Sequence, residues 1–351
     1  MSNGSALTSS QVAGKLPVTV ITGFLGSGKS TLLKRLLTRP EMSRVAVIVN
    51  EFGEIGIDNE LIAEVSENMT LLSNGCLCCT VRTDLEETLR ELFIKRRAGE
   101  IIDFDRVVIE TSGMADPTPV VHTLLTDGMV FSRYRLDGVV TLIDAINGPG
   151  QLQDFPEAGK QVALADRIVI TKTDLAKPAD VEALTNTLTE ANPYAAIYTA
   201  VQGEIDPALL IDVIPARPRA EQVDSWLFGS DKGEGEGGYL GNRARATHTM
   251  NVSSFVLSFD TPFTWDAFAA VTQLLTSLRG PDLLRVKGLV NISGETGPVV
   301  VQGAQHLFHP PVALAAWPSD DRRSRIVFIT RNIPKQAVEG LFTAAAGLAA
   351  H

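Results

Sequence analysis

Cysteine, histidine and aromatic residues are scarce in this sequence of 351 residues. It has three cysteines, which all fall between Cys76 and Cys79, and five histidines. A cluster of three with no other cysteine to pair with is poor disulfide architecture and fits a reducing compartment, so we expect a cytoplasmic protein. The start of the chain lacks the basic-then-apolar pattern of a secretory signal, and we expect a flexible leader over residues 1–15.

An excess of positive charge and long apolar runs are also missing. The chain has 31 Lys and Arg residues against 41 Asp and Glu, a formal net charge of -10. This balance argues against a nucleic-acid binder that works through a broad basic surface. No apolar run is long enough to span a bilayer, so we expect neither a nucleic acid nor a membrane as partner. The length suggests two domains.

Short apolar runs alternate with helical patterns through the first two thirds of the chain. Near-continuous apolar strands separated by helices predict an α/β domain with a mostly parallel sheet that is covered on both faces. The expected strands are 16–22, 45–49, 107–109, 138–143 and 167–170. One expected helix begins at Lys29, and three others cover 84–97, 151–164 and 179–191.

The pattern changes after Trp226. The glycine-rich, charged composition of 229–238 predicts a flexible linker, and we divide the chain into a first domain at 16–228, a linker at 229–250 and a smaller α+β domain at 251–351. Expected strands in the last domain are 255–259, 289–292, 299–301 and 326–329. Expected helices are 264–278, capped at its end by Gly280-Pro281, and 334–348.

The stretch from Gly23 to Ser30 reads GFLGSGKS and matches the phosphate-binding loop of nucleotide triphosphatases, G-x-x-x-x-G-K-[ST]. Its glycines can turn successive backbone N–H groups inward, and the following helix directs its N-terminal dipole at phosphates. Lys29 would neutralise the β and γ phosphates, and the Ser30 hydroxyl would bind Mg²⁺. The expected nucleotide-binding residues of this loop are Gly23, Gly26, Ser27, Gly28, Lys29, Ser30 and Thr31.

An acid ends the predicted strand at 107–109. In P-loop enzymes such a residue helps to position Mg²⁺ or its waters, so Glu110 is a candidate catalytic residue beside Lys29. Three residues on, Gly113 can bring its backbone N–H to the γ-phosphate.

The segment 171–174, Thr-Lys-Thr-Asp, follows the predicted strand 167–170 and resembles the guanine-reading N-K-x-D element of GTPases, with Thr171 in place of asparagine. The Asp174 carboxylate would accept from the N1–H and amino group of guanine, a donor pair that adenine lacks. The Lys172 stem would lie along the base. We therefore expect GTP rather than ATP.

The cysteines form the most unusual motif, Cys76-Leu77-Cys78-Cys79. Thiolates are favoured ligands of Zn²⁺, and three of them leave a tetrahedral site at least one ligand short. Glu54 is a candidate for that place, or the place is open, which suits metal that must be handed on. The alternative is three small buried hydrophobic side chains in a strand. The motif lies between the P-loop and Glu110, where nucleotide-sensing switch segments occur in such chains.

These motifs together resemble the CobW family of metallochaperone GTPases, and within it the YjiA-like branch. The resemblance rests on 23–31, the Asn-Glu-Phe-Gly-Glu segment at 50–54, 75–79, 110–117 and 171–174, in this order, and it extends to the C-terminal domain. It implies Mg-GTP on Lys29 and Ser30, zinc at the C-x-C-C motif, slow hydrolysis and delivery of metal to a client metalloprotein.

This sequence departs from its relatives in two respects. Val49 stands where some carry a metal-binding glutamate directly before 50–54, and the linker holds only His248 where many carry a histidine-rich stretch. His306 and His309 could bind metal, but a histidine pair on an apolar β-rich segment more often packs and hydrogen-bonds.

Our hypothesis is a cytoplasmic GTPase that binds GTP or GDP with Mg²⁺, controls a thiolate zinc site through its nucleotide and passes the metal on, with homo-oligomerisation as a possible response to nucleotide or metal. Glu51 or Glu54 would orient water, or Glu54 would bind metal. One alternative is a nucleotide-gated activator or scaffold for a cobalt or other metalloenzyme. Another is a P-loop kinase, which needs a basic lid where only the run 95–97 is basic.

Overall fold

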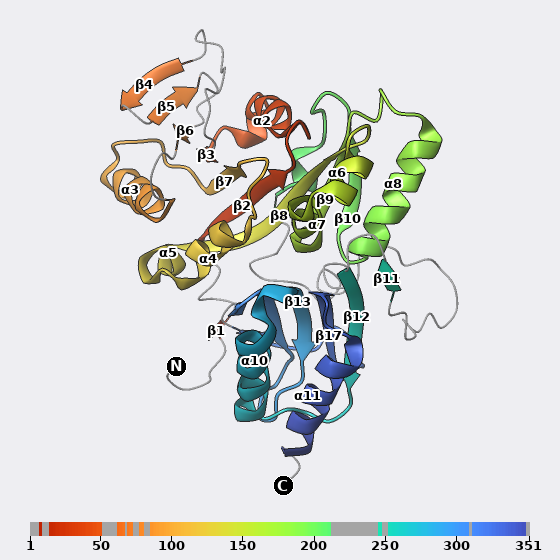
Figure 1. Ribbon diagram of the computed structural model, residues 1–351. Coiled ribbons are helices and arrows are strands. Elements are labelled where there is room, and N and C mark those ends of the chain that lie inside the picture. Colours follow the sequence, from red (N-terminus) through yellow and green to blue (C-terminus); the bar gives the residue numbers. More distant parts are fainter. Residues whose placement is uncertain are drawn as a thin grey trace. The chain divides into compact units, whose positions relative to one another are not determined.

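The computed structural model describes residues 7–8, 14–50, 62–66, 69–72, 77–80, 85–211, 245–247, 252–308 and 311–348. The chain divides into two compact units (Figure 1). Within the described ranges, no helix combines the length and the apolar character that crossing a membrane requires.

The first unit is built on a nine-stranded sheet with the order β10-β9-β8-β2-β7-β3-β6-β5-β4. Neighbouring strands from β10 to β6 pair in parallel, whereas β5 and β4 are antiparallel additions at one edge. The expected parallel sheet is therefore confirmed. The strands are β2 (Leu16–Gly23), β3 (Val45–Asn50), β4 (Ile62–Ser66), β5 (Met69–Leu72), β6 (Leu77–Thr80), β7 (Arg106–Thr111), β8 (Tyr134–Asp144), β9 (Arg167–Thr171) and β10 (Ala196–Ala200).

Helices cover both faces of this sheet, because its central strands are apolar on both sides. In β3, Val45, Val47 and Val49 pack with α2, while Ala46 and Ile48 pack with α3, α4 and α5. The helices are α2 (Lys29–Leu37), α3 (Leu85–Ala98), α4 (Thr118–Thr126), α5 (Gly128–Arg133), α6 (Gly148–Asp154), α7 (Pro156–Leu164) and α8 (Pro178–Ala191), with 3-10 turns η1 (Pro40–Met42) and η3 (Pro207–Leu209).

One expected helix of this unit, 151–164, is wrong. It is broken into α6 and α7 at Phe155, whose backbone is extended (φ -124°, ψ 110°). The residue before a proline is sterically pushed out of the helical region, so Pro156 ends one helix and begins the next. Three short elements, α4, α5 and β10, were not expected from the sequence pattern.

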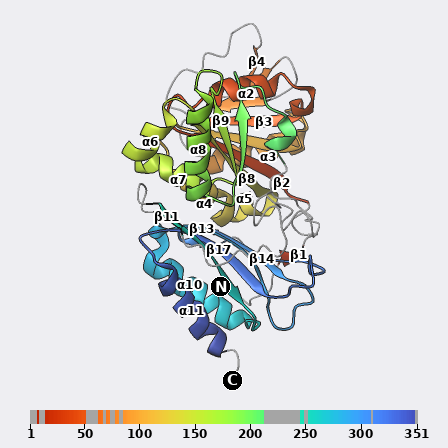
Figure 2. The same cartoon turned by 90° about the vertical axis from the view of Figure 1, so that its right-hand side faces the viewer.

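The second unit is an eight-stranded sheet with α10 and α11 on one face (Figure 2). Phe263, Phe268, Phe328 and Phe342 form a cluster of ring contacts between the helices and the sheet. Its elements are β1 (Leu7–Thr8), β11 (Arg245–Thr247), β12 (Val252–Phe259), α10 (Trp265–Arg279), η4 (Gly280–Asp282), β13 (Leu283–Val290), β14 (Val299–Ala304), β15 (Leu307–Phe308), β16 (Val312–Ala313), β17 (Ser324–Arg331) and α11 (Lys335–Leu348).

Three details of this unit differ from expectation. Leu7–Thr8, within the expected leader, pair with β16, and Arg245–Thr247, within the expected linker, pair with β12. The strand expected at 289–292 is β13, which begins at Leu283 and ends at Val290, because the buried charges Arg285 and Lys287 hide its apolar pattern.

Gly280 follows α10 but is no left-handed cap. Its φ of -46° is right-handed, and the chain continues into η4. A Cβ at this position would overlap the ring of His306, so the glycine is required by close packing rather than by backbone conformation.

Candidate nucleotide and metal site

The loop between β2 and α2 has the backbone of an anion-binding site. Gly23, Gly26 and Gly28 have φ angles of 146°, 74° and 92°, in the region that glycine adopts without strain. Gly28 is the N-cap of α2, so the first free N–H groups of the helix and its positive dipole end face the loop. The Ser27 hydroxyl is fully buried and makes no hydrogen bond within the described residues. The loop therefore presents backbone and side-chain donors that suit phosphate oxygens.

Lys29 and Ser30 open α2 in the positions expected of them. The Lys29 ammonium is buried within the loop and donates to the carbonyl oxygens of Gly23 (2.9 Å) and Phe24 (3.3 Å). The Ser30 hydroxyl donates to Oε1 of Glu110 at 3.2 Å. Glu110 lies in β7, directly beside β2, and is almost fully buried. A hydroxyl and a carboxylate at this separation form the kind of hard oxygen pair that Mg²⁺ prefers.

Gly113 lies against the backbone of the loop. A Cβ on Gly113 would come within 2.9 Å of the Leu25 nitrogen and Cα, so only glycine fits this contact. Gln161, buried in α7, donates to the carbonyl oxygens of Gly113 (3.3 Å) and Ala115 (3.0 Å) and fixes the segment after β7 beside the P-loop.

The Thr171 to Asp174 segment begins at the end of β9 and reaches the P-loop. Thr171 Oγ1 donates to the Ser27 carbonyl at 2.8 Å and lies 3.3 Å from the carbonyl oxygen of Ile143. Lys172 adopts a left-handed backbone (φ 57°) that is uncommon for a residue with a side chain. Asp174 is exposed on the same turn, so its carboxylate is open to a ligand.

Asp144 is a member of this site that the sequence analysis did not find. Its fully buried carboxylate at the end of β8 accepts from Lys172 Nζ (2.6 Å), Asn147 Nδ2 (2.9 Å) and the Ile146 N–H (2.7 Å). Burial raises the pKa of Asp144, but the hydrogen bonds from Lys172, Asn147 and the backbone outweigh it and lower the pKa overall. Asp144 is therefore ionised at neutral pH and fixes the Lys172 ammonium.

The junction of α6 and α7 supports the tip of the P-loop. The rings of Phe24 and Phe155 lie 4.6 Å apart, and Gln151 donates to the Leu25 carbonyl at 3.2 Å. These contacts arise where Pro156 breaks the expected single helix. No local motif indicates these contacts, because Gln151 and Phe155 lie far from the loop in sequence.

Part of the predicted metal site lies in β6, which pairs in parallel with β3. Cys78 and Cys79 are in register with Val47 and Ile48. Cys76, Glu51 and Glu54 lie outside the described residues, as does His309. Within the described part of the chain, no three His, Cys, Asp or Glu residues form a metal-binding group.

His306 has the structural environment that its sequence context favours. Its ring covers Gly280, and its Nδ1 lies 3.2 Å from the Thr276 carbonyl oxygen.

The geometry of the loop, its lysine and the neighbouring acid defines a P-loop nucleotide-binding domain. Comparison with protein families identifies the family within this class of P-loop proteins: the chain belongs to the CobW family. Residues 17–199 match the CobW/HypB/UreG nucleotide-binding domain, and residues 252–346 match the cobalamin synthesis protein CobW C-terminal domain. The resemblance stated from the motifs is therefore confirmed.

Individual relatives match over nearly the whole chain. The zinc chaperone YjiA of Escherichia coli is 35% identical over 336 residues, which cover 93% of this chain and 98% of YjiA. The zinc chaperone CobW of Pseudomonas aeruginosa is 31% identical over 363 residues, covering 92% and 90%. A crystal structure of Zn(II)-bound YjiA GTPase from Escherichia coli matches with a TM-score of 0.75 at 33% identity, covering 94% of this chain and 99% of YjiA.

Proposed function

We propose that this protein is a cytoplasmic GTPase that binds zinc through its C-x-C-C motif and transfers it to client metalloproteins under nucleotide control. Family membership and the P-loop support the GTPase activity, and the zinc chaperones among its relatives support the cargo. The observation that carries the coupling of the two is the register of three neighbouring strands, β7, β3 and β6.

Nucleotide chemistry is assigned to the P-loop and Glu110. Lys29 neutralises phosphate charge, and Ser30 with Glu110 would hold Mg²⁺, which supplies further charge neutralisation when bound. Phosphoryl transfer depends mainly on positioning and charge, so no strong general base is required. Glu51 is proposed to orient the attacking water. Hydrolysis is expected to be slow, as the resemblance to the CobW family implies.

Guanine is assigned to Lys172 and Asp174. The exposed Asp174 carboxylate can accept two donors from the base, and Asp144 holds Lys172 in position through the 2.6 Å contact. Thr171 joins this turn to the P-loop, so a hydrogen bond connects the proposed base site directly to the proposed phosphate site.

Zinc is assigned to Cys76, Cys78 and Cys79, with Glu54 as the proposed fourth ligand. Thiolates select zinc over hard cations, and a single carboxylate completes the tetrahedron while remaining easier to displace than a fourth thiolate. A site of this composition suits release to a client better than a closed four-cysteine site.

Strand register connects the two sites. Thr80 of β6 pairs with Val49 of β3, and Val49 pairs with Glu110 of β7. Two strand spacings separate Thr80 from Glu110, roughly 10 Å along the sheet. A displacement of Glu110 on exchange or hydrolysis of the nucleotide would therefore be transmitted through only one strand, β3, to Thr80, the residue after Cys79. The coupling must be reciprocal: if nucleotide changes zinc affinity, zinc changes nucleotide affinity equally.

The alternative function as a P-loop kinase requires basic residues over the phosphates, and two residues of the basic run 95–97 are paired with carboxylates instead. Lys95 pairs with Glu91 at 2.6 Å and Arg96 pairs with Asp103 at 2.7 Å. A nucleotide-gated scaffold remains the second candidate, and metal transfer is the property that separates it from a chaperone.

The test is a Co²⁺ titration followed by thiolate charge-transfer absorption, with Mg²⁺ and either GDP or a non-hydrolysable GTP analogue. We expect a tetrahedral thiolate spectrum whose affinity differs between the two nucleotides. Equal affinities would separate the metal site from the nucleotide, and the absence of a thiolate band would favour the scaffold. Transfer to a zinc-depleted metalloprotein, with and without GTP, then tests delivery.

A further inference from the structure

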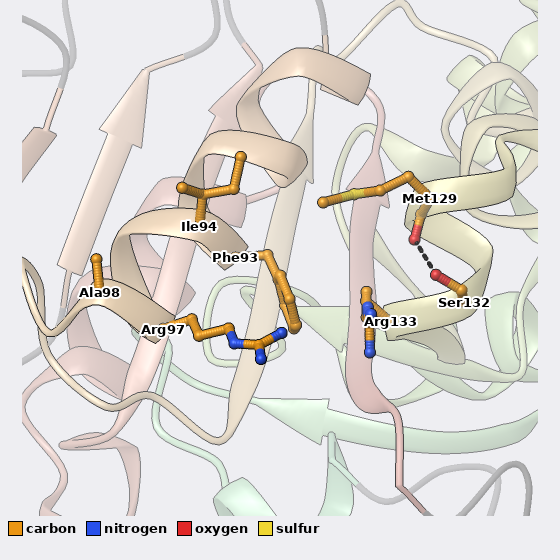
Figure 3. Close-up of a pocket in the computed structure, with 7 residues that line it drawn as sticks. All are labelled: Phe93, Ile94, Arg97, Ala98, Met129, Ser132 and Arg133. Atoms are coloured by element: carbon orange, nitrogen blue, oxygen red, sulfur yellow. Dashed lines mark hydrogen bonds between the residues drawn. The ribbon is translucent and has the colours of Figure 1, made fainter.

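A groove between α3 and α5 has no part in the site described above. Its lining residues come from both helices and border an open cavity of about 470 Å³. Figure 3 shows the side chains of Phe93 and Arg97 reaching from α3 toward α5, while Met129 reaches from α5 toward α3. We call this the α3–α5 groove, lined by Phe93, Ile94, Arg97, Ala98, Met129, Ser132 and Arg133.

The floor and one wall of the α3–α5 groove are apolar. Phe93 packs on the core below, and Ile94 beside it is 60% exposed. Exposed large aliphatic side chains next to a cavity are sites where a partner gains by covering apolar surface. One bulky apolar side chain of a partner could enter between Ile94 and Met129.

Two arginines border the same cavity. The Arg133 guanidinium lies 5.0 Å from the centre of the Phe93 ring, which orders it by a cation–π contact. Arg97 is exposed on α3. Among the described residues, neither arginine forms an ion pair with a carboxylate.

Other cations on α3, in contrast, form ion pairs with carboxylates. Arg90 pairs with Glu86 and Asp127, Lys95 with Glu91, and Arg96 with Asp103. In a chain with a net charge of -10, the two groove arginines thus keep their positive charge uncompensated where most cations nearby are matched. Uncompensated guanidinium groups beside apolar surface favour a carboxylate-bearing partner and increase its association rate.

The groove lies away from the nucleotide. In a parallel sheet, ligands bind at the carboxyl ends of strands, where the P-loop, Glu110 and Thr171 are found. Helix α5 ends at Arg133, immediately before β8 begins at Tyr134, so this end of the groove lies at the amino ends of the strands. A partner in the groove leaves the nucleotide site open.

We propose that the α3–α5 groove docks an acidic segment of a partner protein, with one bulky apolar side chain in the cavity and carboxylates on Arg97 and Arg133. A nucleic acid fits less well, because two arginines around an apolar cavity give few phosphate contacts and no base-stacking surface. The proposal stands independently of zinc transfer, since docking requires neither metal nor nucleotide.

The experiment uses the full-length protein and an array of short synthetic peptides in which glutamates flank one phenylalanine or leucine. The best binder is labelled with fluorescein and titrated by anisotropy against wild type and Arg97→Glu/Arg133→Glu. We expect the double substitution to weaken binding by about a hundredfold, since two charge-assisted contacts are lost. Ile94→Ser, which keeps both arginines, is expected to weaken it by about tenfold.

Arg322→Glu is the matched control, because it makes the same charge change on an exposed arginine of the other unit and should leave peptide binding intact. GTP turnover should be unchanged in every variant, which confirms folding. The proposal is overturned if no acidic peptide binds, or if binding survives the double substitution. Single-stranded RNA, anionic vesicles and a second copy of the chain are tested in the same way. The proposal is also overturned if one of these binds wild type and loses its binding in Arg97→Glu/Arg133→Glu, while peptide binding is the same in both proteins.

Discussion

Thr171 donates a hydrogen bond from its side chain to the main-chain carbonyl of Ser27, at 2.8 Å, across 144 residues of sequence. This contact joins the turn proposed to read the base to the loop proposed to bind phosphates. Thr171 stands where the N-K-x-D element has asparagine, and its hydroxyl makes a side-chain connection to the P-loop from that position. Threonine in place of asparagine therefore still connects the proposed base-binding turn to the P-loop through a hydrogen bond, which we call the Thr171 clamp.

Thr171→Val should test this clamp, since it keeps the shape of the side chain and removes the hydroxyl. We expect GDP affinity to fall about tenfold and the free energy of unfolding to fall by about 1–3 kcal/mol, because a buried carbonyl loses its donor. Calorimetry and urea unfolding measure the two effects. Thr199→Val, on the exposed side of β10, is the control and should change neither. Full GDP affinity in Thr171→Val would show that the clamp is dispensable.

Lys29→Ala should weaken Mg-GDP and Mg-GTP binding by roughly a hundredfold or more, because it removes the buried ammonium group that is proposed to neutralise phosphate charge within the loop. Isothermal calorimetry gives the affinities directly. Lys34→Ala makes the same change on an exposed position of α2 and should retain wild-type affinity. If both variants bind equally well, the phosphate site is elsewhere.

Asp174→Asn should exchange the base preference. An amide at this position can donate to the 2-carbonyl of xanthine but cannot accept both guanine donors, so GTP should bind about tenfold more weakly and xanthosine triphosphate more tightly. Competition against a fluorescent GDP analogue measures both. Asp180→Asn, in the first turn of α8, is the control. An unaltered preference would remove Asp174 from the base site.

Gly113→Ala should impair turnover, because the new methyl group would meet the Leu25 backbone at 2.9 Å and push the P-loop from the segment after β7. A loss of stability of about 1–3 kcal/mol is expected from overpacking. Gly150→Ala, in α6, meets nothing within 4 Å and should be neutral or slightly stabilising. Steady-state phosphate release and thermal unfolding compare the pair; equal behaviour would contradict the contact.

Cys78→Ala should weaken Zn²⁺ binding by at least about a hundredfold and leave GDP affinity in the absence of metal unchanged, because the motif loses one of three thiolates while the P-loop is untouched. Competition with a chromophoric zinc chelator measures the first quantity and calorimetry the second. Zinc affinity equal to that of wild type would make the cysteine a packing residue.

The parts of the site that the sequence predicted are those with local chemistry. The P-loop is contiguous and follows a strand, so its backbone could be expected from Gly23, Gly26 and Gly28 alone. Glu110 could be found because it lies near the carboxyl end of a strand. The same reasoning could have found Asp144, which also ends a strand. It was missed because its partner Lys172 lies 28 residues further on and no motif joins them.

Long-range packing accounts for the other omissions. Gln161 contacts Gly113 from 48 residues away, a relationship that periodicity and motifs do not encode. Pro156 was a readable signal for a break in the helix, and the apolar pattern on both sides of it concealed that break. In β13 the reverse occurred: Arg285 and Lys287 are buried, so an apolar pattern could not show where the strand begins.

The strand order has a consequence for how such a protein could be altered or could diverge. The P-loop, Glu110, Asp144 and Thr171 lie on or directly after four adjacent strands, β9, β8, β2 and β7, whereas β6, with Cys78 and Cys79, lies beyond β3 and is followed by β5 and β4 at the edge of the sheet. The zinc ligands proposed on β6 could therefore be exchanged for another ligand set without altering β9, β8, β2 or β7, so relatives could diverge in metal selectivity while they keep the strands that position the P-loop, Glu110, Asp144 and Thr171.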